Sequence, residues 1–157
     1  MVASLRVADF PRPPAIEQDP RRITIQLGGQ QIADTALAWR ILETTHPPTY
    51  YLPPDAFTPG SVRLGHPRRS LCEWKGQAHY LTIVGGDRVE EDAGWAYANP
   101  LAPYAALRDH IAVYAGRMDR CTLGGEIVTP QPGGFYGGWI TSDLIGPFKG
   151  TPGTEWW

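Results

Sequence analysis

The chain has little cysteine, little net charge and no long apolar run, and each shortage excludes a class of protein. Its 157 residues contain only two cysteines, Cys72 and Cys121, a count that indicates free thiols in a reducing compartment and excludes a four-thiolate zinc site. The 14 Lys and Arg residues against 16 Asp and Glu residues give a formal net charge of -2. Because this balance provides no broad basic surface, we expect neither nucleic acid nor a membrane as a partner.

Apolar runs and metal-binding patterns are also missing. No stretch of about 18 apolar residues is present, which excludes an ordinary transmembrane helix. The first residues, MVASLRVADFPRPP, carry charges and prolines where a signal peptide would have its apolar run, so we expect a cytoplasmic protein. The histidines at positions 46, 66, 79 and 110 lie far apart and form no HxH or HExxH pattern, so we expect no metal site and no cofactor.

Glycine and proline, by contrast, are abundant. The 18 glycines and 16 prolines break helices and favour short strands joined by tight turns. The sequence therefore predicts a mainly β fold with one or two short helical turns. Apolar residues alternate at Ile23, Ile25 and Leu27 before a Gly28-Gly29 pair, which predicts a hairpin, and CTLGGEIVTP predicts a second hairpin on its own glycine pair.

Other segments follow the same pattern. Residues 35–43 are too few for a stable helix and are stopped by prolines, so we expect a strand there. Residues 78–84 and 88–98 alternate in the manner of strands. Residues 53–57 resemble one helical turn, and we expect the span from there to Arg69 to be a loop.

We expect three parts in the chain. Residues 1–21 form an extended arm, because FPRPP favours a polyproline-like path. Residues 22–130 form a single domain. Residues 131–157 form a tail rich in Gly, Pro and aromatic residues, which packs on that domain because its aromatic side chains need either burial or a partner.

The segment ETTHPPTYYLPP is the first candidate for a functional role. A carboxylate at Glu43 can orient the imidazole of His46, as in many acid-base sites, while the two following prolines fix the ring in place. The alternative is a loop histidine that makes one backbone hydrogen bond. Tyr50 and Tyr51 point to opposite faces of an extended segment, so one of them can line a cavity while the other enters the core or solvent.

A second group of candidates lies around CEWKG. Cys72 and Trp74 share one face of an extended segment, and Lys75 sits at the turn. A thiol beside a cation has a lowered pKa and can act as a nucleophile, whereas a buried thiol behaves as a small hydrophobe. Large aromatic residues on the neighbouring strands can form a box around a ligand or can fill the core. These aromatic residues are Trp74, Tyr80, Trp95 and Tyr97.

Four motifs carry a family resemblance. RILETTHPPTYYLPP, CEWKGQAHY, GWAYANPL and the tail PQPGGFYGGWITSDLIGPFKG together resemble the domain-of-unknown-function 427 family over residues 21–118, with the tail of an extended version. The resemblance implies a β-tent: two antiparallel sheets that meet at a steep angle, as in the cereblon drug-binding domain, methionine sulfoxide reductase B and Yippee-type proteins. Several of those relatives pin their sheets with cysteine-bound zinc. Here the resemblance implies that packing of aromatic residues and Pro-Pro segments replaces this pin.

The resemblance implies no established activity, so three hypotheses stand. The first is a module that binds a small polar or cyclic molecule in an aromatic-lined pocket. The second is an enzyme in which His46 acts as acid or base with Glu43, and Cys72 or Lys75 acts as nucleophile or electrostatic stabiliser. The third is a protein-interaction domain that uses the tail, for example to form a homodimer. The pocket of the first hypothesis is lined by Glu43, His46, Tyr50 or Tyr51, Trp74, Lys75, Tyr80, Trp95 and Tyr97.

Overall fold

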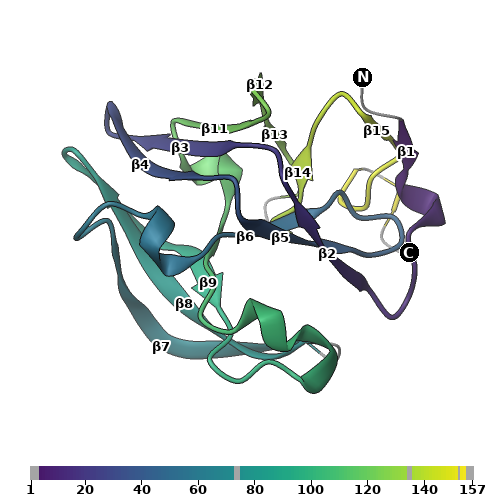
Figure 1. The fold of residues 1–157 in the computed structure, drawn as a ribbon, viewed down its shortest axis with the longest axis horizontal. Coiled ribbons are helices and arrows are strands. Elements are labelled where there is room, and N and C mark those ends of the chain that lie inside the picture. Colours follow the sequence, from purple (N-terminus) through teal and green to yellow (C-terminus); the bar gives the residue numbers. More distant parts are fainter. Residues whose placement is uncertain (1–3, 73–74, 134–135, 152, 155–157) are drawn as a thin grey trace.

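The computed structural model describes residues 4–72, 75–133, 136–151 and 153–154, and its regular elements are mainly β-strands (Figure 1). This confirms the predicted mainly β class. The strands form two four-stranded sheets, one three-stranded sheet and two short two-stranded ladders. All neighbouring strands in the three larger sheets are antiparallel.

The first four-stranded sheet has the order β10-β9-β8-β7. Its strands are β7 (Val62–Cys72), β8 (Gly76–Gly85), β9 (Arg88–Ala96) and β10 (Ala112–Val113). The expected loop up to Arg69 is wrong, because β7 already begins at Val62. β7 pairs with β8 on both sides of an irregularity between Leu64 and Arg69. Gly65 and Pro67 lie within that bulge, and these two residues hid the strand from pattern analysis.

The second four-stranded sheet has the order β12-β11-β3-β4. Its strands are β3 (Ile23–Leu27), β4 (Gln30–Thr35), β11 (Arg120–Leu123) and β12 (Glu126–Ile127). Both predicted glycine hairpins are confirmed. Gly28 and Gly29 join β3 to β4 with φ of 61° and 77°, and Gly124 and Gly125 join β11 to β12 with φ of 59° and 86°. This left-handed backbone region favours glycine over any residue that has a Cβ.

The three-stranded sheet has the order β2-β5-β6 and contains β2 (Ala15–Asp19), β5 (Ala38–Leu42) and β6 (Thr49–Tyr51). β5 confirms the strand predicted over residues 35–43. β2 lies inside the segment expected to be an arm, and each of its residues pairs with β5. The sheets therefore begin before residue 22, because the last proline of FPRPP precedes Ala15 and leaves the following residues free to pair.

The remaining elements are short. β1 (Leu5–Arg6) pairs with β15 (Leu144–Ile145), and β13 (Thr129–Pro130) pairs with β14 (Trp139–Ile140). The 3-10 turns are η1 (Val7–Asp9), η2 (Pro54–Ala56), η3 (Ala102–Leu107) and η4 (Ala115–Arg117). η2 lies within the predicted helical turn at residues 53–57. In the described part of the chain, no helix has the length and apolar character that crossing a membrane requires.

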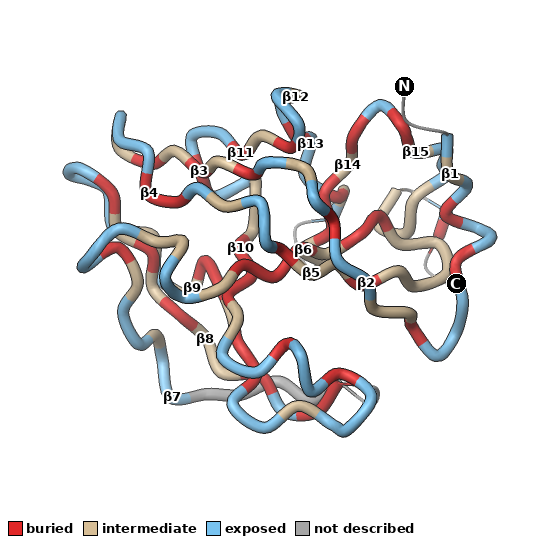
Figure 2. The backbone as a smooth tube through the Cα atoms, viewed as in Figure 1, coloured by how far each residue is buried: buried red, intermediate tan, exposed pale blue. Residues whose placement is uncertain are grey.

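The main core fills the space between the two four-stranded sheets. Ile23, Ile25 and Leu27 of β3 belong to the same buried cluster as Leu81 and Ile83 of β8. A second cluster joins the three-stranded sheet to η3 and β10. Figure 2 shows these buried segments along the central strands, among them β6 and β10.

The two four-stranded sheets touch directly at one end, where the β3–β4 turn meets the β8–β9 turn. A Cβ added to Gly28 would lie 1.9 Å from the carbonyl oxygen of Gly85. Asp119 reinforces the contact, because its carboxylate accepts a hydrogen bond from the Gly29 amide and another from Arg88, both at 3.0 Å. Backbone contact between glycines therefore sets the distance between the sheets at this end.

The glycine contact gives a stability prediction. We expect Gly28→Ala to lower the free energy of unfolding by about 3 kcal/mol, because the clash with Gly85 adds to the strain of a left-handed residue. Gly29→Ala is the matched control: it has φ of 77° in the same turn, with nothing within 4 Å of its added Cβ. It should cost only about 1 kcal/mol. Urea titration measures both values, and equal losses would contradict the close contact.

Candidate functional site

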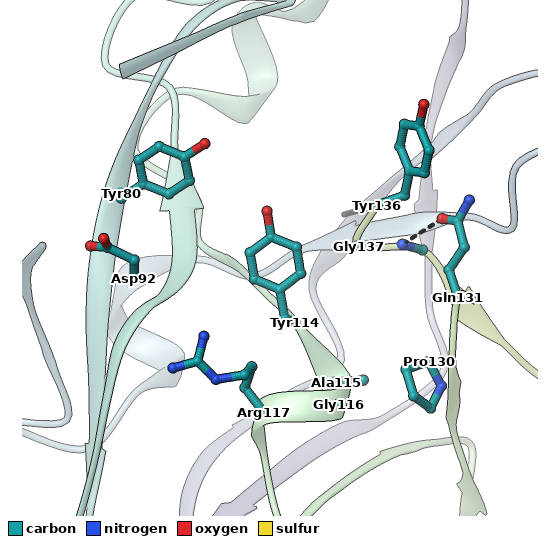
Figure 3. A pocket seen from close by; sticks show the side chains of 11 residues that line it. Tyr80, Asp92, Tyr114, Ala115, Gly116, Arg117, Pro130, Gln131, Tyr136 and Gly137 are labelled. Carbon is teal, nitrogen blue, oxygen red and sulfur yellow. Dashed lines mark hydrogen bonds between the residues drawn. The ribbon is translucent and has the colours of Figure 1, made fainter. Parts of the chain in front are cut away.

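A pocket of about 460 Å³ lies between the β8–β9 surface and the loop that joins β13 to β14 (Figure 3). Five parts of the chain meet there: the adjacent strands β8 and β9, the η4 turn, the end of β13, and the tail. The lining residues are Tyr80, Asp92, Tyr114, Ala115, Gly116, Arg117, Pro130, Gln131, Tyr136, Gly137 and Gly138. Segments that lie up to 58 positions apart in the sequence, from Tyr80 to Gly138, thus share one cavity.

Three half-buried tyrosines dominate the lining. In Figure 3, Tyr114 stands between Tyr80 on the strand side and Tyr136 on the tail side. A tyrosine ring supplies apolar contact area, and its hydroxyl both donates and accepts hydrogen bonds. The pocket can therefore pack against a ring and still recognise polar groups on it.

Asp92 brings a carboxylate to the strand side of the pocket. It lies at an irregularity in the pairing of β8 with β9, and its backbone is left-handed with φ of 52°. The carboxylate accepts a hydrogen bond from the His66 amide at 2.9 Å and contacts His66 Nδ1 at 2.7 Å. Its side chain is only 11% exposed. A bulge redirects a side chain, and here it holds a carboxylate beside the cavity.

Arg117 supplies the opposite charge. Its Nε donates to Glu90 at 2.8 Å, and one terminal nitrogen donates to the Glu91 carbonyl at 2.9 Å. Hydrogen bonds from Arg117 and Arg88 lower the pKa of Glu90 below its usual value, so this carboxylate stays charged and keeps Arg117 in position. The pocket thus holds one acidic and one basic side chain in defined places.

An aromatic cluster forms the support beneath Tyr114. The ring centroids of Trp95 and Tyr114 lie 4.7 Å apart, and the Trp95 indole N–H donates to the Tyr51 hydroxyl at 3.3 Å. Tyr97 lies 6.2 Å from Tyr51, centroid to centroid. A Cβ added to Gly137 would lie 2.1 Å from Trp95, so the tail crosses this indole where only glycine fits.

The two adjacent tyrosines of the sequence motif, Tyr50 and Tyr51, lie in different buried clusters. Tyr51 belongs to the aromatic cluster just described, whereas Tyr50 lies in the main core. The Tyr50 hydroxyl donates to Asp19 at 3.2 Å and accepts from Arg21 at 3.2 Å and from Arg40 at 3.4 Å. Burial raises the pKa of Tyr50 to about 12. Its role in the described structure is to join a buried ionic network.

His46 and Glu43 lie behind the tail side of the pocket. His46 Nε2 is 3.9 Å from the Glu43 carboxylate, and the His46 ring meets the Tyr136 ring edge-on at 4.9 Å. Its Nδ1 lies 3.1 Å from the Gln131 side-chain nitrogen. Burial lowers the pKa of His46, and the charge of Glu43 opposes this shift only in part. The imidazole is therefore neutral at pH 7.

The CEWKG candidates are only partly described. Trp74 lies outside the described residues, and so does the side chain of Cys72, the last residue of β7. The Lys75 side chain is buried, and its carbonyl accepts from the Leu101 amide at 2.9 Å. Burial raises the pKa of the other thiol, Cys121, to about 12. No three His, Cys, Asp or Glu side chains in the described ranges come close enough together to hold a metal ion.

Most pocket residues were missed by the sequence analysis. Tyr80 was among the candidates, but Asp92, Tyr114, Arg117 and Tyr136 were not. Asp92 reaches the pocket through a bulge, which leaves no sequence signal beyond a residue type that tolerates left-handed backbone. Tyr136 did carry a signal, because an aromatic residue beside glycines in a tail expected to pack on the domain is a natural lid for a cavity.

Comparison with known families identifies the domain. Residues 15–124, well over half of the chain, match the family model described as a domain of unknown function, DUF427. The chain belongs to the DUF427 family. No curated protein matches it. Within this DUF427 protein, Tyr80, Asp92, Tyr114 and Arg117 lie inside the matched region, whereas the tail side of the pocket lies beyond it.

The contact between the tail and Trp95 gives a second stability prediction. Gly137→Ala should lower the free energy of unfolding by about 1–3 kcal/mol, because its methyl group would overlap the indole. Gly116→Ala is the matched control in the same pocket, since its added Cβ meets Pro130 at an ordinary 3.6 Å. It should change stability by less than about 1 kcal/mol. Urea unfolding followed by tryptophan fluorescence measures both, and an unaffected Gly137→Ala protein would refute the packing.

Proposed function

We propose that this DUF427 protein binds a small polar molecule containing a ring, in the pocket between β8, β9 and the β13–β14 loop. One observation carries the proposal: three tyrosines, a carboxylate, a guanidinium and an amide from distant segments line one cavity of about 460 Å³. This size lies in the range of about 300–1,000 Å³ that is typical of small-molecule sites.

The chemistry of the lining favours a ligand that has a flat ring and carries polar groups on the edge of that ring. Tyr80, Tyr114 and Tyr136 offer ring surfaces for stacking or edge contact. A donor group on the ligand suits the carboxylate of Asp92, and an acceptor or anionic group suits Arg117. Such mixed recognition agrees with the polar or cyclic ligand expected from the sequence.

The pocket side chains are held before any ligand arrives. Tyr114 rests on Trp95, Asp92 is fixed by His66, and Arg117 is fixed by Glu90. Side chains that are already ordered lose little conformational entropy on binding. This supports a binding role more than a role in general surface packing.

Acid-base catalysis by His46 receives less support from the geometry. Nδ1 of His46 is engaged by Gln131, and the ring lies behind Tyr136 rather than among the residues that line this pocket. We therefore do not propose an enzymatic reaction. The hypothesis that the tail binds another protein also receives little support at Trp139. This residue is only 1% exposed, and its backbone amide donates to the Pro48 carbonyl.

Fragment binding tests the proposal. Saturation-transfer NMR with a set of polar, ring-containing fragments should identify binders, and amide shifts should map them to residues near Tyr80, Tyr114 and Tyr136. Gly116→Leu adds a branched side chain to the lining and should weaken binding at least about tenfold. Ala106→Leu, on the exposed surface of η3, is the control and should bind as the unmodified protein does. Fragments that map elsewhere, or that bind Gly116→Leu unchanged, would refute this pocket.

A further inference from the structure

The tail side of the pocket is docked on the loop that contains His46. The Trp139 amide donates to the Pro48 carbonyl at 2.8 Å, and the Lys149 amide donates to the Thr45 carbonyl at 2.8 Å. These backbone bonds place the β13–β14 loop, which lines the pocket, directly against the histidine. The loop that contains His46 and the tail side of the pocket are therefore joined by backbone hydrogen bonds.

Gln131 connects the histidine to the tail, and its amide has only one acceptable orientation. The side chain is 4% exposed. Its Oε1 accepts from the Gly138 amide at 3.0 Å, and its Nε2 donates to the Lys149 carbonyl at 2.8 Å. If the amide were turned around, its N–H groups would face the Gly138 N–H, and its oxygen would face the Lys149 carbonyl oxygen. Both contacts would then be repulsive. The second N–H of Nε2 is therefore available to His46 Nδ1 at 3.1 Å.

This orientation fixes the protonation state of the imidazole. Nδ1 of His46 accepts the hydrogen bond from Gln131, so the ring proton sits on Nε2, on the side of Glu43. A charged imidazolium carries N–H groups on both nitrogens. Protonation would thus set an N–H of His46 against an N–H of Gln131 and convert an attraction into a repulsion.

We propose that His46 and Gln131 act as a pH-sensitive catch: neutral His46 holds the tail side of the pocket through Gln131, and protonated His46 releases it. Gln131, Tyr136 and Gly138 all line the pocket, so release opens that side. The effect on ligand binding rests on the proposed function. Docking of the tail does not, and it can be measured without a ligand.

The surroundings of His46 set the direction of the effect. Burial is the largest cause of its lowered pKa. The charge of Glu43 raises the pKa, while Lys149, Arg12 and Lys75 lower it further. Because the docked state has the lower pKa, docking is fully favoured above the ordinary value of 6.5 and weakens as pH falls below it.

Thr45, the neighbour of His46, adds an independent sign of strain. It is a β-branched residue with φ of 69°, a conformation such residues rarely adopt. Its buried hydroxyl has no hydrogen-bond partner among the described residues. Strain of this kind persists where surrounding contacts enforce it, and here the Lys149 amide is one of those contacts. Release of the tail would remove this contact, while the hydrogen bond from the Thr45 amide to the Val7 carbonyl at 2.9 Å would remain.

Amide hydrogen exchange by NMR tests the catch directly. Between pH 8 and 5, and after correction for intrinsic exchange, protection of the Gly138, Trp139 and Lys149 amides should fall together by up to about tenfold per pH unit below 6.5. The amide of Ile25, in the core of β3, is the reference and should keep its protection. Constant protection of the three tail amides across this range would overturn the proposal.

Matched variants separate titration from packing. His46→Asn keeps an acceptor near Nδ1 but does not titrate, so it should retain tail protection at pH 5. Gln131→Met removes the amide and should lower tail protection at every pH. His110→Asn, on the loop that follows η3, is the control and should keep the unmodified pH response. A pH response that persists in His46→Asn would assign the effect to another group and overturn the catch.

Binding of a fragment from the screen above completes the test. Its dissociation constant should rise with falling pH in the unmodified protein, and this rise should be absent in His46→Asn. If no fragment binds, the proposed function fails. The exchange data still show whether protonation of His46 releases the tail. If fragments bind with no pH dependence while tail protection falls, the catch stands but does not control the pocket.

Discussion

The backbone contact between two glycine turns is the constraint on which the rest of the structure depends. Gly28 and Gly85 approach so closely that no side chain fits between the sheets at this end, and Asp119 ties the same turns together by hydrogen bonds. β8 and β9 extend from this junction to Tyr80 and Asp92. A chain of ion pairs also leads from the junction to the pocket. Arg88 contacts both Asp119 and Glu90, and Glu90 holds Arg117 at the pocket. The strand side of the pocket is therefore connected to the junction through β8, β9 and these ion pairs.

The junction also bears on how the sheets are held together. The family resemblance implied that aromatic and Pro-Pro packing would replace a metal pin. Aromatic packing is present, because the rings of Tyr50 and Trp139 lie 5.1 Å apart in the main core, and Pro47 packs against Gly138. At the end of the sheets, however, the contact between the Gly28 and Gly85 turns is made by glycine backbone and one carboxylate. Absence of a side chain permits the contact, and this cannot be recognised from the residue type alone.

Local signals in the sequence predicted local structure well. The paired glycines predicted both hairpins because left-handed backbone is a property of single residues, and the short apolar run before the prolines predicted β5. Features that depend on tertiary pairing were not predictable. β7 contains Gly65 and Pro67, which oppose a strand except at a bulge, and Asp92 reaches the pocket only because β9 is irregular there. His46 was selected for its neighbour Glu43, but the imidazole ring lies nearer to the side chain of Gln131, 85 positions away, than to the Glu43 carboxylate.

The hairpin formed by β13 and β14 has two roles in the tail: its ends attach it to the domain, and residues between them line the pocket. Trp139 is buried in the main core, and Pro130 pairs with it across the base of the loop, so both ends of the loop are anchored. Of the described residues between them, Gln131, Tyr136, Gly137 and Gly138 line the pocket. Substitution in this stretch is restricted on its inner side, because Gly137 lies against Trp95 and Gly138 against Pro47 with no room for a Cβ.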